Sequence, residues 1–142
     1  MDISLTLESG LLMSAANESG ARIKVGRPAD YPGATSPMEM VLQAVAGCSS
    51  IDILMILEKQ KATVGRYDVR VHGEREQGNA ATPFTQIVLN YDIDTDAPEE
   101  KVLRAVQLSV EKYCSVAKML EKSVDIRYTL TVNGHPVEPH TP

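Results

Sequence analysis

The chain has 142 residues, a length that predicts one domain over residues 1–142. It is 43% hydrophobic and 23% charged, a balance that argues against intrinsic disorder, and with only 4% aromatic residues its core must be aliphatic. The net charge of −5 and the scattered lysines and arginines argue against a nucleic-acid partner.

The first residues and the cysteines bear on the cellular compartment. No basic segment followed by an apolar stretch stands at the N-terminus, so we expect no secretory signal and predict a cytoplasmic protein. The cysteines, Cys48 and Cys114, lack the spacing of a zinc site, and neither a metal nor a cofactor is predicted. In a reducing compartment two isolated cysteines are more often buried core residues than a disulfide.

The first 26 residues alternate between apolar and polar positions and contain two turn-forming segments. This pattern predicts a three-stranded antiparallel meander. Residues 26–36 follow with two prolines and two glycines, a composition that predicts a loop.

A long helix is predicted next. Residues 36–39, Ser-Pro-Met-Glu, supply an N-cap, a proline at the first helical position and an acidic residue in the first turn. Residues 40–57 carry one charge, Asp52, and are apolar on nearly every face. The segment just reaches transmembrane length, but polar residues at its middle favour the fully packed central helix of a soluble protein, with no membrane partner. We expect Asp52 to be a buried or interfacial carboxylate that has a partner.

Three more strands and a second helix are predicted. The strands lie around residues 67–71, over 85–93 and over 125–132, with a turn at 78–83. A cap, a proline and two carboxylates in residues 94–100 predict the start of an amphipathic helix. Its apolar stripe consists of Val102, Leu103, Val106, Val110, Cys114, Ala117 and Leu120. The proline-rich tail after Gly134 is expected to be loose.

This order of elements predicts an α+β domain in which each long helix carries one cysteine. Apolar surroundings raise the pKa of a thiol and make it inert, so each cysteine taken alone looks structural. Small residues around Cys48 would nevertheless let the second helix approach.

A peroxide-reducing site needs a pair of cysteines, because one thiolate attacks the O–O bond and a second thiol condenses with the resulting sulfenic acid. It also needs a cation beside the first sulfur to stabilise the thiolate. Arg27 is the first candidate for this cation, and Arg22 is the second.

Two segments resemble the cysteine motifs of a known family. Residues 36–48, SPMEMVLQAVAGC, and residues 111–117, EKYCSVA, resemble those of the OsmC/Ohr family, the osmotically inducible and organic hydroperoxide resistance proteins, in particular its YhfA-like branch. The resemblance implies an OsmC-like α+β fold with antiparallel sheets, a long buried central helix and a second, amphipathic helix. It also implies an intertwined homodimer with two active sites at the subunit interface.

The resemblance further implies a cysteine-based peroxidase. Cys48 matches the peroxidatic cysteine and Cys114 the resolving one, and the implied partners are a small organic hydroperoxide and a thiol or dihydrolipoyl reductant. The peroxidase branches have a glutamate directly after the motif proline, where this chain has Met38 and then Glu39. One residue rotates a helical position by about 100°, so Glu39 does not simply substitute for that glutamate. The family's arginine aligns with Arg27.

Two other hypotheses stay open. A non-catalytic member would keep the fold and bind a small apolar or thiol-reactive molecule in the dimer groove, which the methionines Met38, Met40 and Met55 favour. In the other hypothesis both thiols only fill the core. Titration of the thiols with an organic hydroperoxide distinguishes the peroxidase from both.

Overall fold

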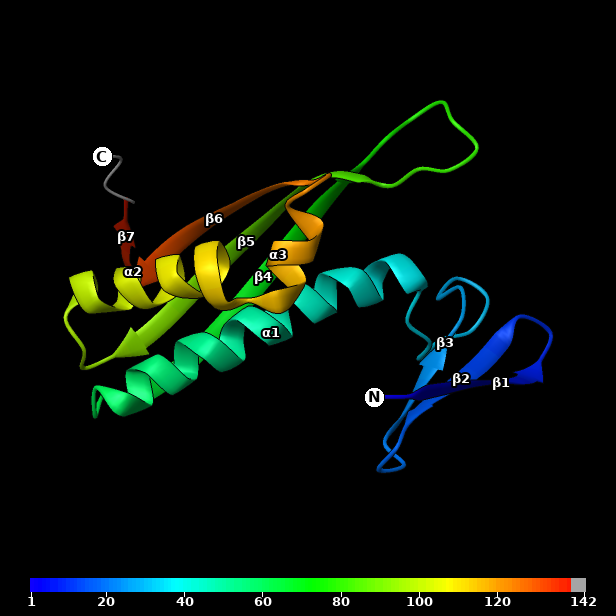
Figure 1. Cartoon of the computed structure of the whole chain (residues 1–142), viewed down its shortest axis with the longest axis horizontal. Coiled ribbons are helices and arrows are strands. Elements are labelled where there is room, and N and C mark those ends of the chain that lie inside the picture. Colours follow the sequence, from blue (N-terminus) through cyan, green and yellow to red (C-terminus); the bar gives the residue numbers. More distant parts are fainter. Residues whose placement is uncertain (139–142) are drawn as a thin grey trace. The chain divides into compact units, whose positions relative to one another are not determined.

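The structure is a computed structural model of the chain, and it describes residues 1–138 (Figure 1). The chain divides into two compact units, Met1–Val41 and Leu42–Pro142. The first holds three strands and the start of helix α1, and the second holds the rest of α1, four strands and the other helical segments. The single domain over residues 1–142 stays a prediction.

The first unit contains an antiparallel sheet in the order β1–β2–β3. Its strands are β1 (Ile3–Ser9), β2 (Leu12–Asn17) and β3 (Arg22–Val25), which confirms the predicted meander. Gly10 and Gly20 stand in the two connecting turns with positive φ, a backbone conformation that glycine adopts without steric cost. The predicted loop follows, and an isolated bridge between Val25 and Thr35 closes it.

Helix α1 (Pro37–Lys59) begins at the predicted proline. The backbone N–H of Glu39 donates to Ser36 Oγ at 3.2 Å, and the backbone N–H of Ser36 donates to Glu39 Oε1 at 3.0 Å. These reciprocal bonds form a capping box, which satisfies two N–H groups at the helix start. The local sequence therefore determines where α1 begins.

Within the single chain α1 is buried along one stripe. Its buried residues, spaced four apart, are Val45, Ser49, Ile53 and Leu57, whereas Ile51 is 62% exposed. The prediction of a helix packed on every face is therefore wrong for the single chain, because four-residue spacing places these side chains along one side only. By length and composition alone α1 meets the requirement for a membrane-spanning helix, as core helices of soluble proteins also do.

The second unit contains a sheet in the order β4–β5–β6–β7. Its strands are β4 (Val64–Arg75), β5 (Phe84–Thr95), β6 (Asp125–Val132) and β7 (His135–Val137), and the first three confirm predicted strands. Strand β7 corrects the expectation of a loose tail: His135 pairs with Val132 across a turn in which Asn133 and Gly134 have positive φ. The remainder of that predicted tail, residues 139–142, lies outside the described residues.

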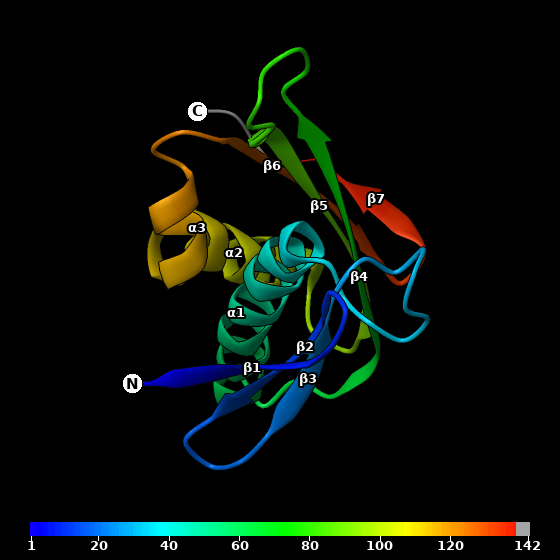
Figure 2. The same ribbon diagram turned by 90° about the vertical axis from the view of Figure 1, so that its right-hand side faces the viewer.

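Strands β5 and β6 are parallel, which differs from the purely antiparallel sheets expected. A parallel pair needs a long crossover, and here the connection contains α2 (Glu99–Leu108) and the helical segments after it. In Figures 1 and 2, α2 and the second-unit part of α1 lie on the same side of this sheet. The buried side chains of β5 fit this arrangement because they alternate along the strand: Ile87, Leu89, Tyr91 and Ile93.

The predicted second helix is interrupted. Helix α2 is followed by a π-helical turn, η1 (Ser109–Tyr113), and by α3 (Ser115–Leu120). Cys114 stands between η1 and α3 with extended backbone angles, φ −69° and ψ 107°. Its N–H donates to the Ser109 carbonyl at 2.7 Å, and this i→i+5 bond widens the turn and ends it. The expectation that Cys114 lies inside a helix is therefore wrong, although it and most of the predicted stripe are buried.

The start of α2 also differs from the prediction. Strand β5 continues to Thr95, and Pro98 is the N-cap residue of α2, with no side-chain cap hydrogen bond. The polar segment 94–100 thus divides between the end of a strand and the start of a helix. Thr95 pairs with Val64 at the end of the strand, and its hydroxyl accepts the N–H of Ala97 at 3.2 Å, one residue before the N-cap Pro98.

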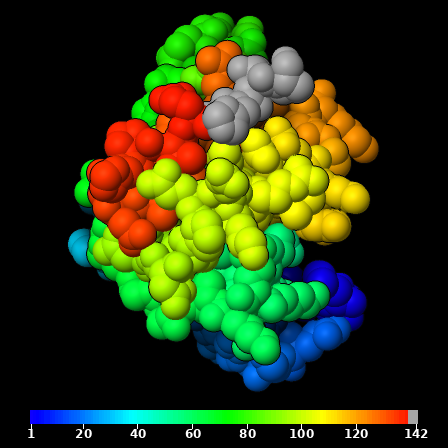
Figure 3. Space-filling model, turned by 90° about the vertical axis from the view of Figure 1, so that its left-hand side faces the viewer, coloured from blue at the N-terminus to red at the C-terminus, as the bar shows by residue number. Residues whose placement is uncertain are grey.

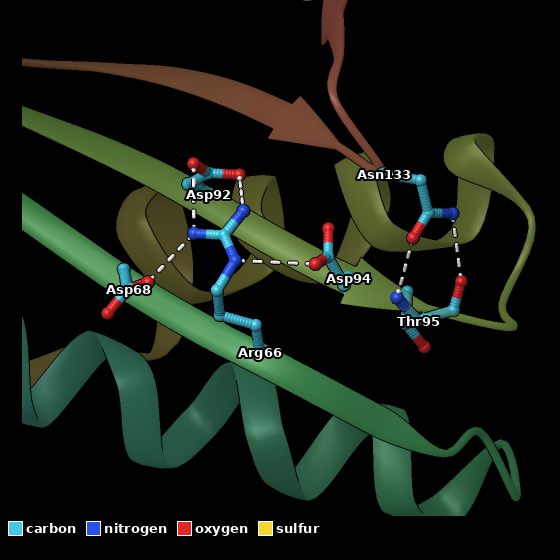
Figure 4. A network of polar contacts seen from close by, with 6 residues as sticks. All are labelled: Arg66, Asp68, Asp92, Asp94, Thr95 and Asn133. Atoms are coloured by element: carbon cyan, nitrogen blue, oxygen red, sulfur yellow. Dashed lines mark hydrogen bonds and ion pairs between the residues drawn. The ribbon is translucent and has the colours of Figure 1, made fainter.

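The other face of the second sheet carries charged side chains. Arg66 on β4 makes ion pairs with Asp68 at 2.8 Å, Asp92 at 2.9 Å and Asp94 at 3.3 Å (Figure 4). All four side chains are about half exposed, so water screens these pairs and their contribution to stability is small. The sheet therefore has an apolar face toward the helices and a polar face away from them.

Asn133 links the end of β5 to the turn between β6 and β7. Its side chain accepts a hydrogen bond from the N–H of Thr95 and donates one to the carbonyl of Thr95, both at 2.9 Å (Figure 4). In Figure 3 the β6–β7 hairpin, in red, lies beside the connection from β5 to α2, in yellow-green. These bonds fix the point at which the crossover toward Cys114 begins.

Candidate functional site

Cys48 lies in the middle of α1, next to Ser49 of the buried stripe. Its thiol is free and its side chain is half-buried. Apart from its two chain neighbours and the nearby backbone of α1, nothing in the described part of the chain lies within 4 Å of the position that a Cβ would take on the preceding Gly47. The helix surface at Gly47 is thus open, and the neighbouring Cys48 side chain is partly exposed in the single chain.

Cys114 is a free thiol with no exposed surface. It is the N-cap residue of α3, and its Sγ accepts a hydrogen bond from the N–H of Ala117 at 3.4 Å. Burial above all, together with the interaction with the Cys48 thiol, raises the pKa of Cys114 to about 11. The structure therefore brings the two cysteines together and keeps the buried one protonated at neutral pH.

Two serines attach this turn of α1 to the sheet. The Ser49 hydroxyl donates to the Ala46 carbonyl at 3.1 Å and lies 2.6 Å from Tyr91 Oη, which then acts as donor to Ser49. Tyr67 Oη donates to Ser50 Oγ at 2.8 Å. Burial raises the pKa of Tyr67 to about 12 and raises the pKa of Tyr91 as well, so both phenols stay protonated. Strands β4 and β5 thereby hold the segment that follows Cys48.

A third serine connects this turn to the second helical segment. Ser109 Oγ donates to the Ser49 carbonyl at 2.8 Å and lies 3.4 Å from Asp52 Oδ2. Asp52 is half-buried, and this contact agrees with the expectation of a carboxylate that has a partner. The sequence interpretation missed Ser109. The signal that would have found it is a polar residue just before Val110 of the apolar stripe.

The two candidate cations lie in the first unit, each with a local partner. Arg27 makes an ion pair with Asp30 at 2.8 Å, and the two side chains are 69% and 47% exposed. Arg22 Nη1 donates to Ser14 Oγ at 3.3 Å. The role of Arg27 beside a thiolate stays a prediction.

Glu39 also lies in the first unit, and its carboxylate accepts the capping-box bond from Ser36. The hydrogen bonds from the Ser36 side chain and backbone lower the pKa of Glu39, so this group is ionised at neutral pH. Helix capping accounts for a carboxylate at this position. A catalytic role for Glu39 stays a prediction.

A comparison of the sequence with known protein families identifies the family of this chain. Residues 29–129 match the OsmC-like proteins. The chain belongs to the OsmC-like family. It is 43% identical over 125 residues to the protein YhfA of Escherichia coli, an alignment that covers 87% of this chain and 91% of YhfA. The resemblance seen in the two cysteine motifs is thus confirmed.

Solved structures share the OsmC-like fold. The OsmC-like protein from Mycoplasma pneumoniae has a TM-score of 0.80 at 18% identity and covers 92% of this chain and 95% of its own. The organic hydroperoxide resistance protein OhrB of Bacillus subtilis has a TM-score of 0.63 at 16% identity, with 92% and 98% covered. These likenesses confirm the predicted OsmC-like α+β fold.

In this OsmC-like protein the two thiols are not equivalent. Cys48 is half-buried, whereas Cys114 has no exposed surface and a raised pKa. Cys48 is therefore the more accessible thiol in the single chain. Because an oxidised sulfur on Cys48 would have the Cys114 thiol beside it, the pair has the arrangement needed to cycle between two thiols and one disulfide.

Proposed function

We propose that this OsmC-like protein is a thiol-dependent peroxidase that reduces organic hydroperoxides through Cys48 and Cys114. The observation that carries the proposal is the interaction between a half-buried thiol and a fully buried one. The fold likeness to a protein named for organic hydroperoxide resistance supports this class of oxidant. A detoxifying role under oxidative stress follows from this activity.

In the first proposed step the Cys48 thiolate attacks one oxygen of the hydroperoxide. The O–O bond breaks, the attacked oxygen stays on sulfur with its hydrogen, and Cys48 becomes a sulfenic acid. The other oxygen leaves as an alkoxide and takes up the proton that the Cys48 thiol had released, which gives the alcohol. The Cys114 sulfur then attacks the Cys48 sulfur, so that an S–S bond forms and the S–O bond breaks. The hydroxyl group leaves as water with the proton of Cys114, and two electrons have passed from the thiols to the peroxide.

The proposed reductant is a thiol or a dihydrolipoyl group. A dithiol attacks the Cys48–Cys114 disulfide, forms a mixed disulfide and closes its own disulfide, which returns both cysteines to thiols. The electrons come from this reductant, so the cycle needs no bound cofactor. Because the cytoplasm keeps thiols reduced, we propose the cytoplasm as the site of action.

Arg27 and Glu39 are retained as proposed peroxide-positioning residues on the strength of the family resemblance. The Arg27–Asp30 pair is exposed, and exposed ion pairs contribute little in water, so the guanidinium loses little when it turns to another anion. Glu39 is engaged by Ser36, and a catalytic use of its carboxylate would open the capping box. Arg27 is therefore the better supported of the two.

We also propose that the protein is a homodimer. Large apolar side chains are exposed on β1, where Leu5 is 59% and Leu7 65% exposed, and on α1, where Ile51 is 62% and Met55 50% exposed. Apolar surface of this extent marks an interaction site, and a second copy of the chain would cover it. Light scattering should give the mass of a dimer at micromolar concentration, and a monomer would contradict this proposal.

The peroxidase proposal is tested by titrating the reduced protein with cumene hydroperoxide. We expect stoichiometric oxidant to remove both thiols and to form a Cys48–Cys114 disulfide, which mass spectrometry detects. Cys48→Ser should consume no hydroperoxide. Cys114→Ser should react once and then accumulate sulfenic or sulfinic acid on Cys48. Equal reactivity of the two variants, or no linkage after oxidation, would contradict the proposal.

A second candidate function is ligand binding without catalysis. One groove of the second unit supports it, lined by Asp52, Met55, Ile56, Lys59, Leu108 and Tyr113. Its mixture of methionine, aliphatic and aromatic side chains suits a small apolar molecule. Thermal stabilisation by such a molecule, with both thiols retained in the presence of hydroperoxide, would favour this function over the peroxidase.

A further inference from the structure

Ser109 makes hydrogen bonds with both cysteine-bearing segments. Its carbonyl accepts the N–H of Cys114 at 2.7 Å, and its hydroxyl donates to the carbonyl of Ser49, the residue after Cys48, at 2.8 Å. Ser109 has no exposed surface, so water does not compete for these bonds. Ser109 thus connects the two segments: its hydroxyl bonds to Ser49, which follows Cys48, and its carbonyl bonds to the backbone N–H of Cys114.

We propose that Ser109 is a positioning residue that sets the distance between the Cys48 and Cys114 sulfurs and thereby favours their disulfide. The inference rests on the proposed function in that it concerns the same cysteine pair. Disulfide geometry is narrow: the Cβ atoms of the two cysteines must lie about 3.5–4.5 Å apart, and deviations store strain. A contact that holds the two helical segments in register therefore raises the effective concentration of one thiol at the other.

The other hydroxyl contacts near the site act differently. Tyr91 and Tyr67 hold the Ser49–Ser50 segment against the sheet, and neither bond includes a residue of η1 or α3. The Ser109 hydroxyl bonds across from η1 to α1. Its removal leaves each cysteine on its own element but loosens the connection between the two elements.

The test compares Ser109→Ala with the wild-type chain in buffers of oxidised and reduced dithiothreitol. Two protein thiols are oxidised as the dithiothreitol disulfide is reduced, so the assay needs no peroxide. Mass spectrometry after thiol trapping gives the equilibrium constant of the Cys48–Cys114 disulfide. We expect that constant to fall in Ser109→Ala by up to about tenfold, because the two segments are held less firmly and the effective concentration of one thiol at the other decreases; the energy of one buried hydrogen bond is the upper bound.

Thr95→Val is the matched control. Thr95 is buried, and its hydroxyl donates to the Thr63 carbonyl at 2.8 Å and accepts the N–H of Ala97 at 3.2 Å. The variant therefore loses a donated bond of the same kind and length as that of Ser109, together with one accepted bond, outside the cysteine pair. We expect its disulfide constant to match the wild type even where its stability falls. Ser109→Thr keeps the hydroxyl and should recover most of the lost constant, and it serves as the second variant if Ser109→Ala does not fold.

The outcomes separate this inference from the peroxidase proposal. An unchanged or increased disulfide constant in Ser109→Ala, an equal fall in Thr95→Val, or no disulfide in the wild type would overturn the positioning role. If the wild type forms the disulfide in dithiothreitol buffers but consumes no hydroperoxide, the peroxidase proposal fails. In that case the disulfide constants of Ser109→Ala and the wild type still show whether Ser109 is a positioning residue.

Discussion

Cys48 and Cys114 are held in two different ways. Cys48 sits within an unbroken helix and is half-buried, whereas Cys114 sits at a break between two helical segments and is fully buried. The helix around Cys48 is fixed by its own backbone and by side-chain hydroxyls from β4 and β5. The backbone at Cys114 is fixed by the widened turn that Ser109 closes.

This difference gives the two thiols different accessibility in the single chain. Cys48 lies on a regular helix and keeps part of its side chain exposed in the single chain. The break lets the Cys114 sulfur serve as the N-cap of α3 while it stays buried beside the Cys48 thiol. A buried, protonated thiol resists bulk oxidants and reacts with the neighbour that reaches it. The different burial of the two thiols thus follows from the backbone conformation at each cysteine as well as from the surrounding side chains.

The largest expected effect is a difference in alkylation rate. With iodoacetamide and the reduced protein at neutral pH, Cys48 should be modified about 100-fold faster than Cys114, because Cys114 becomes accessible only by local opening. Peptide mass spectrometry over time measures both rates. In denaturant the two rates should become equal, which is the control. Similar rates in the native protein would contradict the asymmetry.

A smaller effect is expected at alkaline pH. The pKa of Cys114 is raised to about 11 from an ordinary value of 9.0, so the folded state favours the protonated thiol. This contribution to stability is fully present below pH 9 and is lost as the pH rises through 11, because only the unfolded chain ionises easily. At pH 10.5 the loss amounts to about 2 kcal/mol of unfolding free energy.

Urea unfolding of the reduced protein at pH 8 and pH 10.5 measures this loss. Cys114→Ala is the comparison, since it removes the titrating thiol and keeps the phenols that also ionise at high pH. We expect the variant to lose about 2 kcal/mol less than the wild type between the two pH values. An equal loss in both proteins would mean that the Cys114 thiol is not protected from ionisation.

The smallest expected effect concerns the tyrosines behind Cys48. Tyr91→Phe removes a hydroxyl that donates to the fully buried Ser49, so we expect a cost of about 1 kcal/mol in unfolding free energy. Tyr67→Phe removes a hydrogen bond to the half-buried Ser50. Because water is able to replace that bond, the loss of unfolding free energy should be smaller. Urea denaturation of both variants gives the order. A larger cost for Tyr67→Phe would show that β4 rather than β5 anchors the Cys48 turn.

Several elements could be predicted from the sequence because their signals are local. Residues 36–39 predicted the start of α1 at Pro37, since a capping box needs only residues three apart. The alternation over residues 125–132 predicted β6 with the bounds that it has. The two cysteine motifs predicted the family, which is confirmed. They also predicted a redox pair of Cys48 and Cys114, which stays a prediction, although the two thiols interact in the structure.

Other features depend on tertiary contacts that no local pattern encodes. The apolar stripe through Cys114 predicted one continuous helix, and the same stripe stays buried when a π-helical turn interrupts it, so periodicity does not reveal the break. The parallel pairing of β5 with β6 likewise follows from the crossover and not from either strand's composition.

The sequence by itself thus determined where α1 begins and which family the chain belongs to, and it named the two cysteines as the candidates for chemistry. The tertiary structure decided which thiol is fully buried, how the backbone runs at Cys114 and which hydroxyls bond to the segments that carry the pair. The physical reason is the separation along the sequence between the residues that interact. Caps and strand alternation act between near neighbours, whereas the bond from Ser109 to Ser49 exists only after the chain between them has folded around β4 and β5.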